Sequence, residues 1–487
     1  MRAAGAIALV LGGSAAGCSL VAGLGDPKVF DAGTGSQRGV FPRDVPDGAE
    51  ADATLDGDEL GSVLGDEDAL KEANATDAPE GVIAEGGFDS NSSACDSFDG
   101  GSPLAQAVAI SVASTHACAV VNVAPGSPEN GTVRCWGSNR DGELGRDPCL
   151  SFSSRPHTVL DRALPALSDV GTLALGEGFS CAITTPATGF LSCWGNVPVV
   201  AGEVTRDPTA PEYLPSLMRF YNTQLEQIVT ASLSAAGGCA SRTDQSLLCW
   251  GMFASGTTRI GNGGGEGGAV NTPESFEAVV VGRAHACVIA TRNGVRDVEC
   301  WGDNTQGQAG FLGVSSVGGP AAVGVSQCGQ VTQLAVGGDQ SCAVVQNAVN
   351  AVYCWGSNAS GQLLDAGGGS AVRRVAFGSM SDPKEVAVGD SHACARMTDG
   401  SVWCWGDNSA SQLGTGPPGP AEATPSVVKR RNNALLQGVD RVAAGGKTTC
   451  VTLATDPNVR CWGANDYGQA GQPPQSMPVP YATLVAW

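Results

Sequence analysis

The 487-residue sequence is poor in aromatic and in basic residues. Only 5% of it is Phe, Trp or Tyr, and 27 Lys and Arg stand against 48 Asp and Glu. Nucleic-acid binding needs basic groups that neutralise phosphates, so a chain with a formal net charge of −21 is not expected to bind nucleic acid. In contrast, 69 Gly and 27 Pro are typical of many short strands joined by tight turns.

Common catalytic and metal-binding motifs are also missing. The chain contains no Gly-x-Ser-x-Gly, no His-Glu-x-x-His and no Cys-x-x-Cys. Gly446-Lys447-Thr448 resembles the end of a phosphate-binding loop, but Arg441 stands where the loop requires its first Gly. We therefore predict a protein that is not an enzyme and that binds no cofactor and no metal.

The N-terminus has the pattern of an export signal. One basic residue, Arg2, precedes an apolar run over residues 3–13, which is too short for a stable membrane span. The following Ala15-Ala16-Gly17-Cys18 resembles a bacterial lipobox, and this resemblance implies that residues 1–17 are removed and Cys18 is lipidated. An ordinary signal peptide that contains a Cys is the alternative. Ser19 after the Cys favours the outer membrane or cell surface.

Residues 18–100 form an acidic region without strand or helix periodicity. Residues 26–100 hold about 19 Asp and Glu against about 4 Lys and Arg. Such a segment cannot bury enough apolar area to offset the entropy of ordering its backbone. We expect a disordered tether, since the Asp spacing does not fit a calcium loop.

Residues 101–487 contain one unit repeated seven times. Cys-Trp-Gly recurs with Trp at 136, 194, 250, 301, 355, 405 and 462, at the spacing expected for propeller blades. Before this anchor lie segments such as 386–395, which read Val-Ala-Val-Gly-Asp-Ser-His-Ala-Cys-Ala. After it come turns such as 406–414, which read Gly-Asp-Asn-Ser-Ala-Ser-Gln-Leu-Gly.

These units resemble the repeats of the chromosome-condensation-regulator family, over about residues 104–487. The resemblance implies an all-β fold, a seven-bladed β-propeller, preceded here by the signal peptide and the acidic tether. Blades two and three depart from the pattern at 195–198 and 251–254, so we expect altered loops there. The last segment, 482–487, could supply a strand that closes the ring.

Fourteen cysteines form seven similar pairs, one per repeat. The 10 to 17 residues between partners suit facing positions on adjacent antiparallel strands, which lie within disulfide range. We predict seven disulfides, with free buried thiols as the alternative and zinc disfavoured, because each repeat offers only two ligands. The pairs are Cys118 with Cys135, Cys181 with Cys193, Cys239 with Cys249, Cys287 with Cys300, Cys342 with Cys354, Cys394 with Cys404 and Cys450 with Cys461.

Three cysteines, Cys95, Cys149 and Cys328, lie outside the seven pairs, and the sequence does not show which of them pair.

Three of the histidines occupy the same position of the repeat, namely His116, His285 and His392. Other copies of the repeat have Phe179 or Gly237 there, so we interpret this histidine slot as a packing position.

These observations predict a non-enzymatic scaffold that binds a protein or cell-surface ligand outside the cytoplasm. It would be a monomer that touches the membrane only through its lipid anchor. A candidate interaction loop between blades two and three gathers residue types enriched in interfaces, and the alternative is a loop or short helix packed on the ring. Its residues are Tyr213, Leu217, Met218, Arg219, Phe220 and Tyr221. The alternative function is an extracellular hydrolase or lyase acting on polysaccharide.

Overall fold

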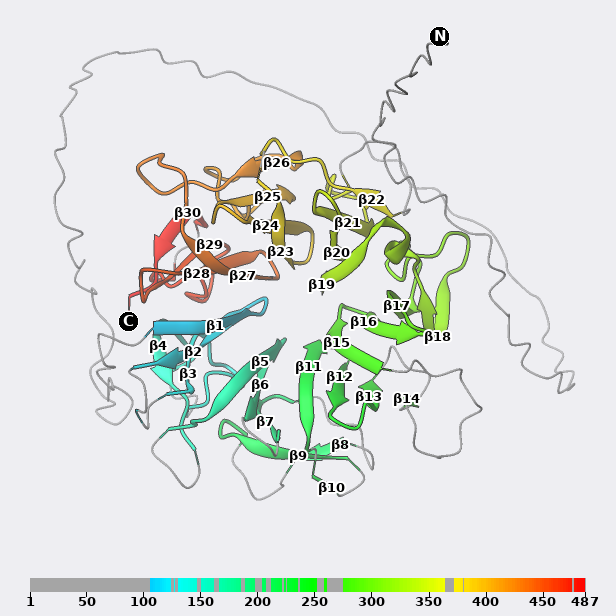
Figure 1. The fold of residues 1–487 in the computed structure, drawn as a ribbon. Coiled ribbons are helices and arrows are strands. Elements are labelled where there is room, and N and C mark those ends of the chain that lie inside the picture. The colour runs from blue at the N-terminus through cyan, green and yellow to red at the C-terminus, as the bar shows by residue number, and fades with distance from the viewer. Residues whose placement is uncertain are drawn as a thin grey trace, which may run out of the picture. The chain divides into compact units, whose positions relative to one another are not determined.

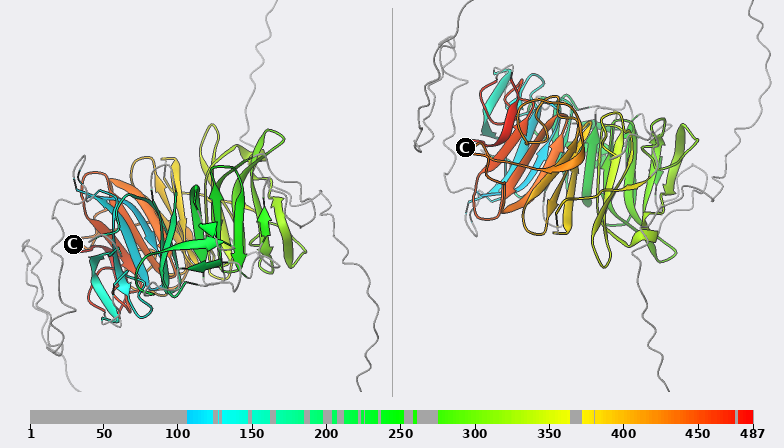
Figure 2. Two further views of the ribbon diagram at one scale, coloured as in Figure 1. Left: turned by 90° about the horizontal axis from the view of Figure 1, so that it is seen from below. Right: turned by 90° about the horizontal axis from the view of Figure 1, so that it is seen from above.

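The computed structural model shows an all-β ring of seven blades around a central axis (Figure 1). Its edge-on views show the ring as a disc of tilted sheets (Figure 2). The residues that the structure describes are 106–123, 127, 130–146, 150–161, 166–184, 189–197, 204–206, 212–220, 223–224, 226–234, 237–251, 258–260, 275–363, 372–379, 381–474 and 477–486. The predicted signal peptide, Cys18 and acidic tether lie outside these residues.

Every blade is an antiparallel sheet of strands that are consecutive in the chain, with the first strand innermost (Figure 1). Blade one contains β1 (Gln106–Val112), β2 (His116–Asn122), β3 (Thr132–Ser138) and β4 (Phe152–Thr158). Blade two contains β5 (Val170–Gly176), β6 (Phe179–Thr184), β7 (Leu191–Gly195), β8 (Val204–Arg206), β9 (Ser216–Phe220) and β10 (Thr223–Gln224). Blade three contains β11 (Ile228–Ser234), β12 (Gly237–Arg242), β13 (Leu247–Gly251) and β14 (Thr258–Ile260).

The remaining blades repeat the four-stranded plan. Blade four contains β15 (Ser275–Val281), β16 (His285–Arg292), β17 (Val295–Asp303) and β18 (Ser316–Ala322), and the 3-10 helix η1 (Val325–Cys328) leads to blade five. Blade five contains β19 (Gln330–Gly337), β20 (Gln340–Gln346), β21 (Ala351–Gly356) and β22 (Arg373–Arg374). Blade six contains β23 (Pro383–Val388), β24 (His392–Met397), β25 (Val402–Gly406) and β26 (Glu422–Val427), and blade seven contains β27 (Val439–Gly445), β28 (Thr448–Leu453), β29 (Val459–Gly463) and β30 (Val479–Leu484).

The middle strands of each blade are almost completely buried, because their side chains pack against the neighbouring blades on both sides. The seven Trp residues of the repeat are at most 2% exposed and are among the largest buried side chains. Each of the seven first strands carries a β-bulge near its start, which increases the local twist of the innermost strand. In the described part of the chain, no helix is long and apolar enough to cross a membrane.

Disulfide-bonded cysteines were predicted, and the structure confirms them. Each of the seven pairs lies directly opposite on the second and third strands of one blade, with Cα atoms 4.0–4.1 Å apart. Cys328 is also disulfide-bonded, whereas Cys95 and Cys149 lie outside the described residues. Each of these seven bridges therefore joins two strands within one blade.

The ring closes without a strand shared between its two ends. β30 is the outer strand of blade seven and pairs with β29, so the expectation that 482–487 closes the ring is wrong. Instead, the Trp136 indole N–H of blade one donates to the Gln469 carbonyl of blade seven at 3.0 Å. A single hydrophobic cluster also spans the seam, with Val112 and Trp136 on one side and Val442 and Trp462 on the other.

Blade two departs from the common plan, as the sequence predicted for its loops. β9 pairs with β7 as the outer strand, and the short strands β8 and β10 both pair with β9. The expectation for blade three at 252–254 lies outside the described residues.

The seam predicts a position-specific cost of adding one methyl group. A Cβ on Gly445 would collide with the Val112 carbonyl across the seam, whereas a Cβ on Gly318 in β18 would meet open space. We expect Gly445→Ala to lower the free energy of unfolding by about 1–3 kcal/mol, and Gly318→Ala to change it by less than about 0.5 kcal/mol. Denaturant unfolding of both variants measures the difference, and equal effects would contradict closure through this contact.

Candidate interaction face

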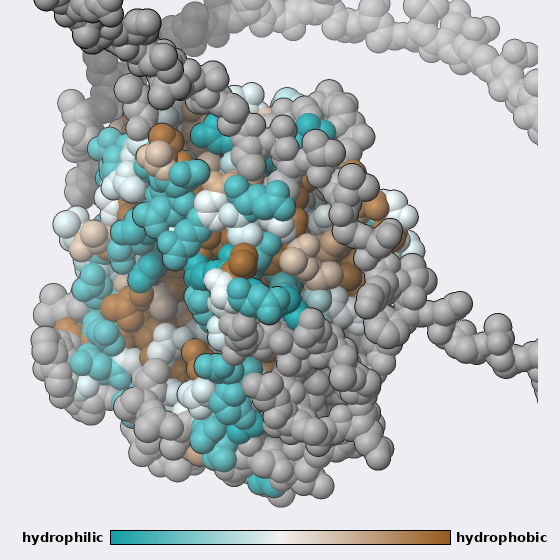
Figure 3. Space-filling model, turned by 45° about the vertical axis from the view of Figure 1, so that its right-hand side comes forward, coloured by the Kyte–Doolittle hydropathy of each residue, from teal (hydrophilic) through white to brown (hydrophobic). Residues whose placement is uncertain are grey.

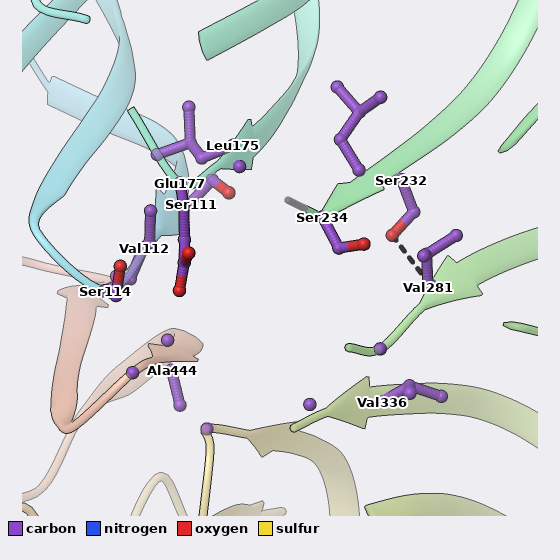
Figure 4. A pocket seen from close by; sticks show the side chains of 18 of the residues that line it. Ser111, Val112, Ser114, Leu175, Glu177, Ser232, Ser234, Val281, Val336 and Ala444 are labelled. Atoms are coloured by element: carbon purple, nitrogen blue, oxygen red, sulfur yellow. Dashed lines mark hydrogen bonds between the residues drawn. The ribbon is translucent and has the colours of Figure 1, made fainter. Parts of the chain in front are cut away.

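The C-terminal ends of all seven first strands converge on a central channel, which contains a cavity of about 390 Å³. The channel is lined mainly by glycine, serine and small apolar residues, and its charged lining residues are Glu177, Arg283 and Asp390. Figure 4 shows Glu177 reaching into this space from the end of β5, with Ser114 and Ala444 nearby. We call the face at this end of the strands the turn face, and the opposite one the hairpin face.

Five turns between third and fourth strands build the turn face. In each, an Asn accepts a hydrogen bond from the backbone N–H five residues later, at 2.8–3.3 Å, and four of these Asn residues are buried while Asn358 is half-buried. A buried Gln or Glu four residues after this Asn accepts from the backbone N–H two residues before itself, at 2.6–2.9 Å. The Asn residues are Asn139, Asn304, Asn358, Asn408 and Asn465, and the second residues are Glu143, Gln308, Gln362, Gln412 and Gln469.

The same turns hold the next blade through their main chain. The carbonyl oxygen of Glu143 accepts the Trp194 indole N–H of blade two at 2.9 Å, and Gln412 accepts that of Trp462 in the same way. Trp405 and Trp136 make the equivalent bonds to Gln362 and Gln469 at 3.0 Å. Four of the five turns are therefore hydrogen-bonded to the Trp of the next blade, which restrains the turn face, whereas the Trp355 indole N–H after the Gln308 turn has no partner.

The histidine slot has a role that the sequence analysis missed. His116, His285 and His392 are fully buried, and the Nε2 of each lies 2.8 Å from a hydroxyl of the next blade, on Ser180, Ser341 and Thr449. Each hydroxyl donates its own proton to a turn carbonyl, as Ser180 does to Glu143 at 2.9 Å, so Nε2 must carry the ring proton. A repeat with His is followed by a repeat with Ser or Thr one position later in the same segment, and this correlation was readable from the sequence.

Burial dominates the ionisation of these histidines. It lowers the pKa of His116 and of His285 to about 3 and that of His392 to about 4. The Nδ1 of each ring has no hydrogen-bond partner, so a protonated ring would place an unsatisfied charged donor inside the fold. The three histidines are thus neutral structural links between blades.

Charge differs between the two faces. Five ion pairs lie toward the hairpin face, including Arg396 with Glu385 at 2.9 Å and Arg292 with Glu299 at 2.8 Å. On the turn face, the ion pairs between described residues are Arg283 with Asp339 at 3.7 Å and Lys447 with Asp407 at 3.5 Å. Further carboxylates there have no ion-pair partner among the described residues, for example Asp141, Glu177, Asp390 and Asp466.

On the side that Figure 3 draws, hydrophilic residues spread across the described surface, and hydrophobic ones form small separate groups between them. This side therefore offers little continuous apolar area.

The predicted interaction loop over 212–221 is largely a strand. Residues 216–220 form β9 in the sheet of blade two, so the expectation of a loop or short helix is wrong there. Met218 is 1% exposed and belongs to the core, while Leu217 and Arg219 are half-buried. Tyr213 lies on the turn face against Gly142 of the blade-one turn. The side chain of Phe220 and all of Tyr221 lie outside the described residues.

The described residues assemble no evident catalytic or metal centre. No group of three or more His, Cys, Asp or Glu among them could hold a metal ion. The two carboxylates that line the channel, Glu177 and Asp390, come from blades two and six.

Family models of the regulator of chromosome condensation (RCC1) repeat match residues 384–412, 439–469 and 399–452, which lie in blades six and seven. Two of the seven blades therefore match the RCC1 repeat. Their matched residues include the Gly-x-x-His segment and the Trp-Gly-x-Asn turn from which the sequence predicted this fold.

Solved RCC1-type propellers share the architecture. Prp20p from Saccharomyces cerevisiae, described with its binding to Gsp1p and histones, is 18% identical with a TM-score of 0.56 over 72% of this chain and 85% of that one. Yeast RCC1 bound to Kap60 is 17% identical, with a TM-score of 0.55 over 72% of this chain and 83% of that one. Human WBSCR16 is 17% identical, with a TM-score of 0.57 over 72% of this chain and 94% of that one. At these identities the similarity establishes the fold alone.

The histidine links between RCC1 repeats predict a pH dependence of stability. The unfolded state binds protons to His below its ordinary pKa of 6.5, while folded His392 stays neutral down to about pH 4, so stability falls as the pH drops between these values. Replacing His392 by Gln, the residue at position 340 in blade five, removes one such group. We expect the slope of unfolding free energy against pH, between pH 4.5 and 6, to decrease by about 1.4 kcal/mol per pH unit.

Guanidinium unfolding of the wild type and His392→Gln at several pH values measures this slope. An unchanged slope would show that His392 is protonated in the folded protein. Phe179→Leu, at the same slot in blade two, is the control that repacks the slot without removing a titrating group.

Proposed function

We propose that the protein is a non-enzymatic scaffold that binds a protein partner through the turn face of its propeller. The observation that carries this proposal is an acidic face on which four of the five turns are hydrogen-bonded to the Trp of the next blade, and on which several carboxylates lack ion-pair partners among the described residues. Rigid loops favour binding because little conformational entropy is lost when a partner docks. The related Prp20p is described as binding other proteins, which agrees with a binding role.

The second part of the proposal is display outside the cytoplasm on a lipid attached to Cys18. Seven intra-blade disulfides support an oxidising compartment, because cytosolic thiols are kept reduced. The lipobox-like residues 15–18 support the anchor. Acyl chains contribute about 0.8 kcal/mol per buried CH₂, so several chains give a durable attachment.

The third part concerns where the partner sits. Of the residues predicted for interaction, Tyr213 lies on the turn face, and Leu217 and Arg219 lie on the outer strand of blade two. The backbone and Cβ of Tyr213 lie against Gly142 of the blade-one turn, and Tyr is a residue type enriched at interface hot spots. We place the contact on the turn face at blades one and two.

The anchor predicts a specific outcome for Cys18→Ser in a bacterial host. We expect the variant to lose incorporation of a labelled fatty acid and to move from the membrane fraction to the soluble exported fraction. The propeller should keep its unfolding midpoint, because residues 106–486 carry the fold. Membrane association that persists unchanged in the variant would contradict the lipid anchor.

The binding face predicts different results for the half-buried Tyr213 and the exposed Leu435. Tyr213→Ser on the turn face should reduce recovery of the partner in proximity labelling on intact cells by at least about tenfold, in line with hot-spot losses. Leu435→Ser is the matched control, since Leu435 is 49% exposed and lies toward the hairpin face. Loss with Leu435→Ser but not Tyr213→Ser would reverse the assigned face, and no specific partner for the wild type would refute the scaffold.

A further inference from the structure

The connection between blades six and seven carries a run of basic residues. Lys429, Arg430 and Arg431 follow β26, and residues 423–439 contain no Asp or Glu. The whole chain holds 48 Asp and Glu against 27 Lys and Arg. The charge of this connection is therefore opposite to that of the chain as a whole.

Backbone hydrogen bonds hold this run in a fixed hairpin. The backbone N–H of Arg430 donates to the Ala434 carbonyl at 2.8 Å, and an antiparallel β-bridge joins the first and last residues of the hairpin. The Lys429 carbonyl accepts the N–H of Ala482 in β30 at 3.1 Å, which fixes the hairpin against the outer strand of blade seven. We call residues 429–435 the basic hairpin.

The three basic side chains are not used within the described part of the chain. No described residue forms an ion pair or a side-chain hydrogen bond with any of them. The Nε of Arg430 is buried without a hydrogen-bond partner among the described residues, although a buried donor is costly to leave unpaired. Arg431 is exposed, and Lys429 and Arg430 are half-buried. An anionic group can therefore reach this site from the solvent.

The acidic segment of the same chain enters the ring beside the basic hairpin. Residues 26–100, with about 19 Asp and Glu against about 4 Lys and Arg, end six residues before β1. The N–H of Ala107 in β1 donates to the Pro457 carbonyl, in the loop between β28 and β29, at 3.3 Å. In the same loop, the N–H of Ala454 donates to the carbonyl of Gly438, just after the basic hairpin, at 2.9 Å. One loop of blade seven thus contacts both the entry point of the acidic segment and the base of the hairpin.

We propose that the acidic segment 26–100 docks on the basic hairpin of its own chain. Charge complementarity favours this occupant, because fixed cations without partners attract carboxylates. The six residues between the segment and β1 span at most about 20 Å when extended, so the segment has a high effective concentration at the hairpin. The contact lies beside the β28–β29 loop and leaves the turn face uncovered. It depends neither on the proposed partner nor on the proposed lipid.

Carbodiimide cross-linking of the full chain tests this contact, because it joins a Lys amine directly to a carboxylate that touches it. We expect mass spectrometry to find cross-links from Lys429 to carboxylates of residues 26–100 within one molecule. Lys384 is the matched control, since it is also an exposed lysine of blade six but lies outside the basic hairpin. It should give at least about fivefold fewer cross-links to the segment, and 1 M salt should remove those of Lys429, because the Debye length is then about 3 Å.

A double variant separates the hairpin from the general charge of the protein. Arg430→Gln with Arg431→Gln removes two charges and keeps the Lys429 amine as the reporter. We expect its cross-link yield to fall about fivefold, in line with the loss of two exposed charge pairs, at an unchanged unfolding midpoint. Arg140→Gln with Arg283→Gln removes the same charge from the turn face and should change the yield by less than about twofold.

Three results would each overturn the inference. Equal yields from Lys429 and Lys384 would mean that only the overall charge attracts the segment. Cross-links formed only between molecules, at a yield that rises with protein concentration, would make a second copy the occupant. Binding to phosphatidylglycerol vesicles that requires Arg430 and Arg431, with no cross-link from Lys429 to the segment, would make the hairpin a membrane-contacting surface.

Discussion

One carbonyl oxygen in each complete turn joins that blade to the next. In blades one and six it accepts both the indole N–H of the following Trp and a hydroxyl that is bonded to a buried His. Four of the seven repeat Trp residues are paired with such a carbonyl, whereas the indole N–H groups of Trp301 and Trp355 are buried without a partner. Where the bonds form, they favour one register between neighbouring blades, because a buried donor is costly to leave unpaired. The ring thus depends on turns that sit at its surface but are fixed from its interior.

The seven cross-strand disulfides act within single blades, each over a loop of 10 to 17 residues. At the seam between blades seven and one, the described contacts are hydrophobic packing and hydrogen bonds. Blades stabilised in this way resemble repeat proteins in general, where each unit contacts only its neighbours.

The two faces of the ring differ in how far their carboxylates are neutralised by ion pairs. On the hairpin side, several acidic residues meet Arg side chains at close range, so the surface charge is locally neutralised. Around the channel, carboxylates such as Glu177 and Asp390 have no such partner within the described chain. Fixed, unpaired charges steer oppositely charged partners and select among them more than they add affinity.

The sequence by itself determined the repeat, the blade number and the disulfide partners. These follow from local patterns: seven Cys-Trp-Gly anchors, alternating apolar residues and constant spacing between cysteines that face each other on adjacent strands. The structure of the irregular segments was not predictable from these local patterns. Residues 216–220 form a strand because they pair with β7, and β30 belongs to blade seven and does not close the ring.

Only the tertiary structure decided which residues meet between blades. His116 contacts Ser180 across 64 positions of sequence, and Trp136 reaches Gln469 across 333, because the ring brings consecutive repeats, and its two ends, side by side. The Glu143 carbonyl likewise lies at the junction of blades one and two only because Trp194 and Ser180 of the next blade donate hydrogen bonds to it. Spacing along the chain sets local pairing, but burial and electrostatics depend on neighbours that the closed ring supplies.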